Sequence, residues 1–414
     1  MPSLRTAKRT LLTALTAVVA CFAAAPLRAE TVVYLEAGPE LLDGQGFATL
    51  EPGVSFESRL LEGRLGLPVR LRLNEHLASR DGMLRREDWD SLSDAGRLVR
   101  RVELSIAERT FTLRLGALAH EASGHGTIVN GLGSSLDPDS LPLGAKARLV
   151  LGPLALELLG ADLFAPGAVG AAATLEPLSL WGEQNDRLHV SGSFFADPRA
   201  PARGDSARAL VYGLGVDLAV LRGRQMRLAP YLDANGRGSG FGLHAGLLAD
   251  LALGKADLSL KAEWRRAKSP YLPEYFDIAY PIERHLYFAG GPVEPKADAA
   301  PGTSNSWRGE ARLVVGPLAM AASLSGRGHS RYDAALVVNL GAGAFDLAAF
   351  VALRGFEWGH NPEKLYLLAE GRYRLGSYLY LWASGGQLYR IEEERSDGRG
   401  SLGIATGLGV ALAP

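Results

Sequence analysis

Short segments in which every second residue is apolar recur through most of this sequence. In the segment 64–74, leucine or valine occupies each odd position, and Arg64, Arg70 and Arg72 stand between them. The same alternation recurs in the segments 110–115, 257–264, 308–315 and 364–375. Because successive side chains of a β-strand point to opposite faces, each segment is predicted to form a strand with one apolar and one polar face.

The lengths of the strands and of their connections favour a membrane-spanning barrel over a soluble β-sandwich. The segments are about ten residues long, which is the length of a tilted strand that crosses a bilayer. Their apolar faces are nearly free of charge, as contact with lipid requires. Tight turns are expected near 108–109, 152–153, 222–223, 254–255, 316–317 and 376–377. Longer polar loops alternate with them at 76–95, 119–142, 196–206, 265–306, 355–363 and 390–400. Short turns at one end and long loops at the other are typical of outer-membrane barrels.

These features predict an all-β fold, a transmembrane antiparallel up-and-down β-barrel, formed by one domain over residues 30–414. Counting hairpins gives about 16–20 strands, and an even number is the rule for such barrels. Closure into a barrel leaves no unpaired strand edge in lipid. A barrel of this size encloses an aqueous lumen unless a loop or plug fills it. The segment 31–39 is either a first strand or a segment inside the barrel.

The N-terminus predicts export from the cytoplasm. Arg5, Lys8 and Arg9 form a basic head, an apolar run over 11–25 follows, and Ala29 ends the segment. The run is too short for a mature transmembrane helix, so residues 1–29 are expected to be a cleaved signal peptide. A rival interpretation is a lipoprotein signal that ends at Cys21, the single cysteine of the chain. Ordinary cleavage removes that residue and leaves a mature chain without disulfides or cysteine-bound metals.

The predicted last strand, 401–413, keeps Leu402, Ile404, Leu408, Val410 and Leu412 on one face. With these strands, turns and loops, the chain resembles the Gram-negative outer-membrane β-barrels, and the porins most, over nearly all of 30–414. The resemblance implies an outer-membrane location, with outer-membrane lipid, the barrel assembly machinery and small polar solutes as partners. Homo-oligomerisation stays open. The family usually ends in an aromatic residue, whereas this chain ends in Pro414. A net charge of −1 gives no reason to expect nucleic-acid binding.

The polar face of each strand is expected to line the lumen. The predicted pore-lining residues are Arg64, Arg70, Arg72, Arg101, Glu103, Arg114, Lys146, Arg148, Lys261, Glu263, Arg308, Glu310, Arg312, Glu370, Arg372 and Arg374. Basic residues dominate the first part of this set, and charged walls set ion preference in narrow pores. Two hypotheses follow: a mild preference for anions, or arginines that are paired with carboxylates and confer no selectivity.

One loop segment is a candidate constriction. Porin loops at the comparable third place often fold inward, and by that resemblance the candidate residues here are His120, Glu121, His125, Thr127 and Asn130. The H-E-x-x-x-H spacing is one residue longer than the helical zinc-protease motif, and the glycines around it argue against a helix. We therefore predict neither a metal site nor a cofactor.

Two further segments carry local signals. Asn235-Gly236 is a typical hairpin turn sequence. The connection 265–306 contains six aromatic residues and is expected to have structure of its own at the pore mouth.

The sequence as a whole predicts a porin-like channel for passive diffusion of small polar solutes or ions. No nucleophile and base stand at a diagnostic spacing, so an enzyme is not expected. The alternatives are an outer-membrane enzyme of the lipase or protease type and a closed structural or adhesive barrel.

Overall fold

The fold is described from a computed structural model, which places residues 30–73, 82–106, 110–118, 120–134, 141–180, 187–201, 209–285, 287, 294–299, 302–327, 331–357, 362–388 and 401–412. The main sheet contains β1 (Glu30–Leu42), β2 (Gln45–Glu57), β3 (Leu61–Gly66), β4 (Val69–Arg72), β5 (Val99–Ile106), β6 (Phe111–Gly116), β8 (Gly144–Leu151), β9 (Leu154–Gly160), β10 (Val169–Leu175), β11 (Leu188–Asp197), β12 (Ala209–Leu218), β13 (Leu221–Arg222), β14 (Met226–Arg237), β15 (Gly240–Leu253), β16 (Ala256–Lys268), β18 (Thr303–Val315), β19 (Leu318–Arg327), β20 (Arg331–Ala342), β21 (Phe345–Phe356), β22 (Lys364–Arg374), β23 (Leu379–Leu388) and β24 (Ser401–Leu412).

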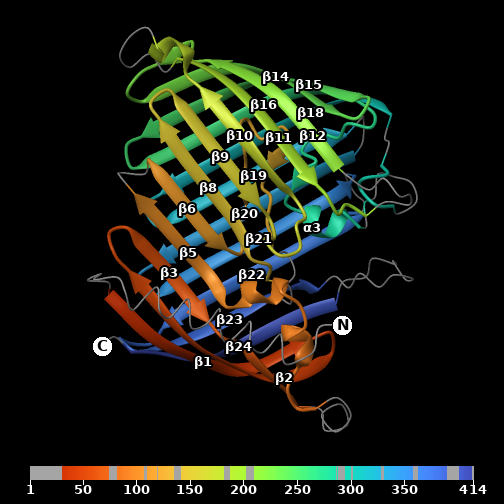
Figure 1. Ribbon diagram of the computed structural model, residues 1–414. Helices are drawn as coiled ribbons and strands as arrows, with labels where there is room; N and C mark the ends of the chain where they lie inside the picture. The colour runs from red at the N-terminus through yellow and green to blue at the C-terminus, as the bar shows by residue number, and fades with distance from the viewer. Residues whose placement is uncertain are drawn as a thin grey trace.

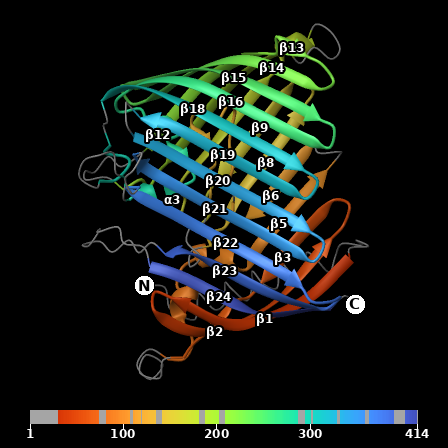
Figure 2. The same cartoon turned by 180° about the vertical axis from the view of Figure 1, so that it is seen from behind.

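With β3–β4 and β12–β13 each counted as one strand, each strand of this sheet pairs antiparallel with the next one along the chain, and β1 pairs with β24, which closes the sheet. The segments β3 and β4 both pair with β2, and β12 and β13 both pair with β14. Each of these two pairs of segments therefore forms one interrupted strand, and the closed barrel has 20 strands. Figures 1 and 2 show the tilted strands around the ring from opposite sides. The predicted barrel and the upper limit of the predicted strand number are confirmed, and 31–39 lies within β1 as a first strand.

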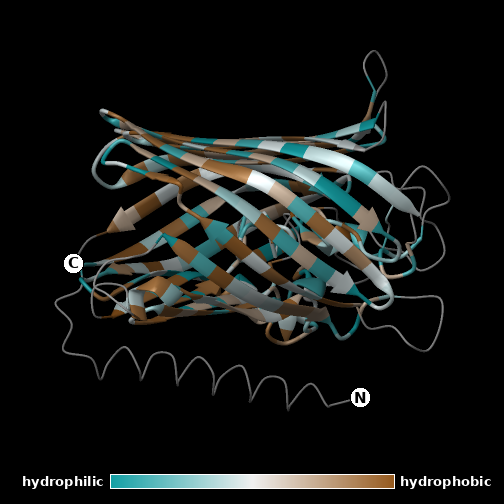
Figure 3. Cartoon of the chain, turned by 90° about the horizontal axis from the view of Figure 1, so that it is seen from above, coloured by the Kyte–Doolittle hydropathy of each residue, from teal (hydrophilic) through white to brown (hydrophobic). Residues whose placement is uncertain are grey.

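The barrel has an apolar outside and a polar inside. Large apolar side chains stay exposed on the outer face, such as Leu158 at 59% and Leu214 at 70%. On the inner face, charged residues such as Arg70 and Asp233 are buried. Hydrophobic and hydrophilic residues alternate along the strands in Figure 3. A water-soluble protein shows the opposite arrangement, so this surface is suited to lipid.

The two ends of the barrel differ as predicted. One end carries short connections such as 152–153, 254–255 and 316–317, together with the ends of β1 and β24. The other end carries the long connections, which include 73–98, 117–143 and 269–302. The turn predicted at Asn235-Gly236 is wrong, because both residues lie within β14 and the chain reverses at 238–239 instead.

The described parts of three long connections fold into the barrel, and these connections are named here by their order at that end. L2 is 73–98 and contains the 3₁₀ turns η1 (Arg86–Trp89) and η2 (Ser93–Arg97). L3 is 117–143 and contains β7 (Val129–Asn130). L7 is 269–302 and contains β17 (Phe276–Asp277) and α3 (Tyr280–Glu283). A further 3₁₀ turn, η3 (Pro177–Leu180), lies at the short-turn end.

No helix among the described residues is long and apolar enough to cross a membrane.

The alternation of faces can be tested on two neighbouring alanines of β19. Ala322 is exposed on the outer face, whereas Ala321 pairs with the inward-facing Arg312. We expect Ala322→Arg to lower the free energy of unfolding by about 2–4 kcal/mol, the cost of a cation on the lipid face near mid-membrane, and Ala321→Arg to cost under about 1 kcal/mol. Denaturant titration of the barrel folded into phospholipid vesicles measures both values. Equal costs for the two variants would contradict this assignment of faces.

Candidate functional site

The centre of L3 is attached to the barrel wall through His125. Its Nδ1 lies 2.7 Å from Asp233 Oδ1 on β14, and its Nε2 lies 3.2 Å from Asp217 Oδ2 on β12. The ring stacks on Tyr231, with 4.5 Å between ring centroids. Lys261 of β16 donates to the His125 backbone carbonyl at 2.7 Å. One loop residue thus contacts three strands of the wall.

The wall is shaped to receive L3 at this point. Thr127 donates from Oγ1 to Asp233 Oδ2 at 2.8 Å, which adds a second contact to the same carboxylate. A Cβ at Gly213 on β12 would lie 3.0 Å from the side chain of Ile128 and 2.0 Å from Asn235. A residue larger than glycine at position 213 would therefore displace Asn235 of the neighbouring strand and crowd Ile128 of L3.

L3 and L7 are joined to each other inside the barrel. Strands β7 and β17 pair in parallel, with Val129 opposite Phe276 and Asn130 opposite Asp277. The Glu274 backbone N–H donates to the Thr127 carbonyl at 2.9 Å. The two loops therefore form one body, which we name the inner body.

Glu274 is the charged centre of this joint. It is buried, and it forms ion pairs at 2.9 Å with Arg265 of β16 and with Arg308 of β18. The Asn130 amide donates to Glu274 at 2.6 Å and to Glu310 at 2.7 Å. Burial opposes ionisation of the carboxyl, yet the two guanidinium groups lower the pKa of Glu274. The carboxylate therefore stays charged and holds L3, L7 and the wall together.

L7 continues from this joint across the lumen. Near α3, Tyr280 donates to Asp197 of β11 at 2.7 Å, and Arg284 pairs with the same carboxylate at 3.0 Å. On the far side, Arg354 of β21 pairs with Asp277 and with Glu283. Six complete strands, β14, β15, β16, β18, β19 and β20, separate β11–β12 from β21 along the ring. L7 thus bridges two separate parts of the wall.

Apolar packing follows the same path. One cluster includes Val129, Leu132, Tyr271 and Phe276 of the loops with Phe195 of the wall. A second cluster joins Ile278 and Ile282 of L7 to Phe350 and Tyr366 of β21 and β22. Buried apolar contacts inside a barrel give the inner body a core of its own.

L3 and L7 each contain one non-glycine residue in a left-handed backbone conformation that is uncommon outside glycine. His120 has φ 56° and Glu274 has φ 51°. Such backbone strain costs about 1–3 kcal/mol per residue and persists where the surrounding contacts hold it. Both residues lie where L3 and L7 meet the wall, so the strain coincides with the joint.

All the predicted pore-lining residues lie on strands of the barrel, but their surroundings differ. Arg70 and Arg72 are buried beneath L2, where they pair with Asp88 and Glu87. Lys261 and Glu263 are buried beneath L3 and L7. The predicted side chains that pair with a partner are Arg64, Arg70, Arg72, Arg101, Glu103, Arg114, Lys146, Lys261, Glu263, Arg308, Glu310, Glu370, Arg372 and Arg374.

Arg148 and Arg312 differ from the rest of that set. Both are exposed on the inner face of the wall, and neither has an ion-pair partner within the part of the chain that the structure describes. Around the other cations, carboxylates balance the charge. Examples are Arg64 with Glu36 at 2.7 Å and Lys146 with Glu121 at 3.0 Å.

The predicted constriction residues lie in L3 but do not gather at one point. Glu121 pairs with Arg114 and Lys146, whereas His125 contacts Asp217 and Asp233. Burial lowers the pKa of His120, whose side chain lies beside Gly131. Among the described residues, no group of three His, Cys, Asp or Glu side chains is arranged to hold a metal ion.

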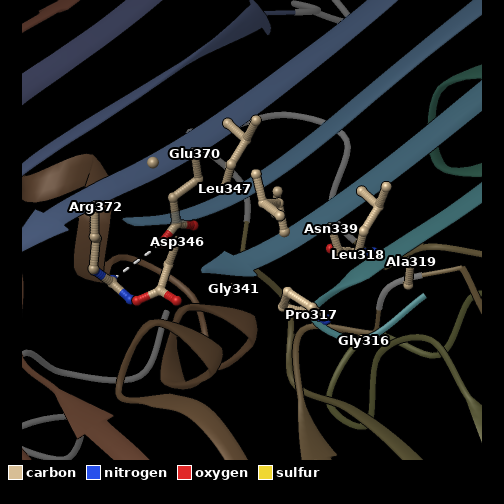
Figure 4. Close-up of a pocket in the computed structure, with 13 residues that line it drawn as sticks. Gly316, Pro317, Leu318, Ala319, Asn339, Gly341, Asp346, Leu347, Glu370 and Arg372 are labelled. Atoms are coloured by element: carbon tan, nitrogen blue, oxygen red, sulfur yellow. Dashed lines mark ion pairs between the residues drawn. The ribbon is translucent and has the colours of Figure 1, made fainter. Parts of the chain in front are cut away.

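A cavity of about 350 Å³ opens at the short-turn end, along β18–β22. Figure 4 shows Asp346, Glu370 and Arg372 converging there, and Arg372 pairs with Glu370 at 3.0 Å. The same Arg372 lines a neighbouring cavity of about 370 Å³ with Arg64, Arg374 and Tyr380. At the short-turn end, the lumen is therefore lined by charges of both signs.

Sequence reasoning missed two of the acidic partners that matter most here, Asp197 and Glu274. Asp217 and Asp233 alternate with apolar residues, and this alternation already assigns both to the inner face, although it does not show that they bind L3. Glu274 lies in an irregular segment without periodicity, and no local signal marks it.

No family model matches the sequence, and no curated protein matches it significantly. Solved structures that the chain resembles include OccK8 (OprE), OccK3 (OpdO) and OccK11 (OpdR) of Pseudomonas aeruginosa. Identity is 10%, 13% and 12%, and TM-scores are 0.36, 0.37 and 0.38. The matches cover 94%, 93% and 93% of this chain and 98%, 96% and 96% of those chains. At such identities and scores, neither substrate nor activity passes to this chain.

The attachment of L3 should weaken at alkaline pH. Hydrogen bonds to Asp217 and Asp233 outweigh burial and raise the pKa of His125 to about 9. The raised pKa means that the imidazolium contributes fully below its ordinary pKa near 6.5 and that this contribution is lost as pH rises through about 9. Hydrogen–deuterium exchange of 120–134, corrected for intrinsic rates, should therefore speed up above pH 9.

Two variants distinguish the effect of His125 titration from that of other titrating groups. His125→Gln should exchange quickly at every pH. His285→Gln should behave as the wild type, because burial and Arg284 lower the pKa of His285 to about 4 and leave it neutral throughout this range. Wild-type exchange in 120–134 that shows no transition between pH 7 and 10 would contradict the role given to His125.

Proposed function

We propose that this chain is a porin-like channel of a Gram-negative outer membrane, through which small polar solutes or ions diffuse passively. The observation that carries the proposal is a set of exposed charges on the inner face of a closed barrel. The Arg101, Arg374 and Glu370 side chains are 57%, 64% and 54% exposed. Charged groups need water or partners, so this part of the lumen is suited to an aqueous path.

The inner body would restrict the path to part of the barrel cross-section. It covers the inner faces of β12, β14 and β16 and bridges to β21. We infer that solutes pass on the remaining side, along the charged faces of β3, β5, β6 and β8 and past the cavity of Figure 4. L3 and L7 together would then form the constriction that sequence analysis assigned to L3 alone.

The ion preference is proposed to be mild. The paired arginines contribute little net charge to the lumen, so the basic residues of the first strands do not by themselves favour anions. Arg148 and Arg312 have no ion-pair partner among the described residues and would supply a weak preference for anions.

A closed structural barrel is the second candidate, and the lumen-crossing segment of L7 favours it. An enzymatic role has less support. The hydrogen bonds of His125 to Asp217 and Asp233 occupy both ring nitrogens, so the imidazole is not available as a base for a nucleophile.

The inferred export would follow from residues 1–29, which lie outside the described residues. The proposed membrane partner is outer-membrane lipid, in contact with the exposed apolar face. The outward row Leu402, Ile404, Leu408 and Leu412 of β24 supports recognition by the barrel assembly machinery.

Planar-bilayer recording with a salt gradient tests the channel and its selectivity. We expect stepwise conductance from refolded residues 30–414 and a reversal potential slightly on the chloride side. Arg148→Gln combined with Arg312→Gln should move that potential toward zero or to the potassium side. Lys255→Gln, in the short β15–β16 turn outside the lumen, removes a charge and should leave the potential unchanged.

Silence from a folded, heat-modifiable barrel would overturn the channel and leave the closed barrel. Conductance whose reversal potential is the same in the double variant and the wild type would refute the role given to the two arginines.

A further inference from the structure

Among the described strands, the lipid-facing surface carries charge at one place. The outward positions of these strands hold apolar or neutral residues, except at Arg266 and Lys268 near the end of β16. Both side chains are exposed, and they alternate with the buried Arg265 and Ala267, which face inward. Their orientation therefore follows from the pleat of the strand.

Neither cation is neutralised by a neighbour within the described residues. The strand partners of Arg266 are Leu243 and Asn305. Those of Lys268 are Phe241 and Thr303. On the inner face, by contrast, most cations lie within 4 Å of a carboxylate.

The position of the two cations on the barrel suggests their partner. They lie at the long-loop end of β16, directly beyond Trp264, which pairs with Trp307 of β18. These two tryptophans are 45% and 43% exposed on the outer face. Exposed tryptophans on a barrel mark the level of lipid headgroups. An unpaired cation is far less costly at that level than at mid-membrane.

We propose that Arg266 and Lys268 form a binding site for the phosphate group of a lipid headgroup in the leaflet at the long-loop end. Two residues apart on one face, their Cα atoms are about 7 Å from each other, so both side chains reach one headgroup. The guanidinium can bind phosphate oxygens in pairs, and the ammonium adds a second positive charge. Asn305 supplies a neutral donor beside Arg266. The lipid's acyl chains would lie along the apolar outer face below.

This inference rests on the proposed membrane location but not on an open lumen. A titration of the refolded full mature barrel in zwitterionic detergent micelles tests it directly. The probes are diphosphoryl lipid A, a phosphatidylcholine of similar chain length and inorganic phosphate. Bound lipid is counted by native mass spectrometry, and heat-modifiable migration in gels confirms folding.

Arg266→Gln combined with Lys268→Gln should bind diphosphoryl lipid A about 25-fold more weakly than the wild type, roughly fivefold for each charge removed. Lys255→Gln, which removes a charge at the opposite end of the same hairpin, should bind as the wild type does. Phosphatidylcholine, whose phosphate is offset by a choline cation, should bind more weakly and with a smaller difference between variants.

Three outcomes would overturn the proposal. They are unchanged lipid A binding by the double variant, an equal loss in Lys255→Gln, and displacement of lipid A by inorganic phosphate at equal concentration, which would indicate a free-anion site. Failure of the channel proposal is distinguishable, because these variants leave the lumen unaltered. If the wild type did not conduct ions, the result on lipid binding would still stand.

Discussion

The pairing of β1 with β24 is the constraint on which the rest of this structure depends. In lipid, an unpaired backbone N–H or C=O has no water to bind, and each one costs several kcal/mol. Closure pairs the backbone N–H and C=O groups at the edge of β1 with those at the edge of β24. Once the sheet is closed, each strand must present an apolar face to lipid, so its polar side chains must point into the lumen. The alternation in the sequence and the charged interior are thus two results of one requirement.

The interior then faces a problem of its own, since many charges share a confined space. Carboxylates such as Asp217 and Glu274 compensate the cations, and the same groups bind the loops. Pairing a buried charge with a partner of opposite sign avoids the large cost of leaving it alone. The inner body of L3 and L7 is held by these contacts rather than by a domain of its own. The network that neutralises the lumen is therefore also the network that narrows it.

Much of this fold was predictable because membrane strands repeat a simple pattern. Period-two segments, outer faces nearly free of charge and connections of unequal length predicted the barrel, its two ends and the upper limit of its strand number. L3 was recognised from its glycines and histidines together with the resemblance to porins. Local sequence signals failed where tertiary contacts determine the backbone conformation. Asn235-Gly236 does not form the predicted turn but continues β14, because Asn235 faces inward and donates to Tyr271 of L7. The joint at Glu274 and the bridge to Arg354 connect residues that are far apart in sequence. The periodicity of the sequence cannot predict such contacts.

Cysteine accessibility along β19 tests the central claim, a water-filled barrel whose strands alternate between lumen and lipid. Cys21 is the only cysteine of the chain, so single substitutions at 319–324 in refolded residues 30–414 give a clean background. A membrane-impermeant thiol reagent, added to vesicles that contain the barrel, should label positions 319, 321 and 323 and leave 320, 322 and 324 largely unlabelled. Uniform labelling, or labelling of the even positions instead, would contradict the account. Absence of labelling at all six positions would show that water does not reach this part of the lumen.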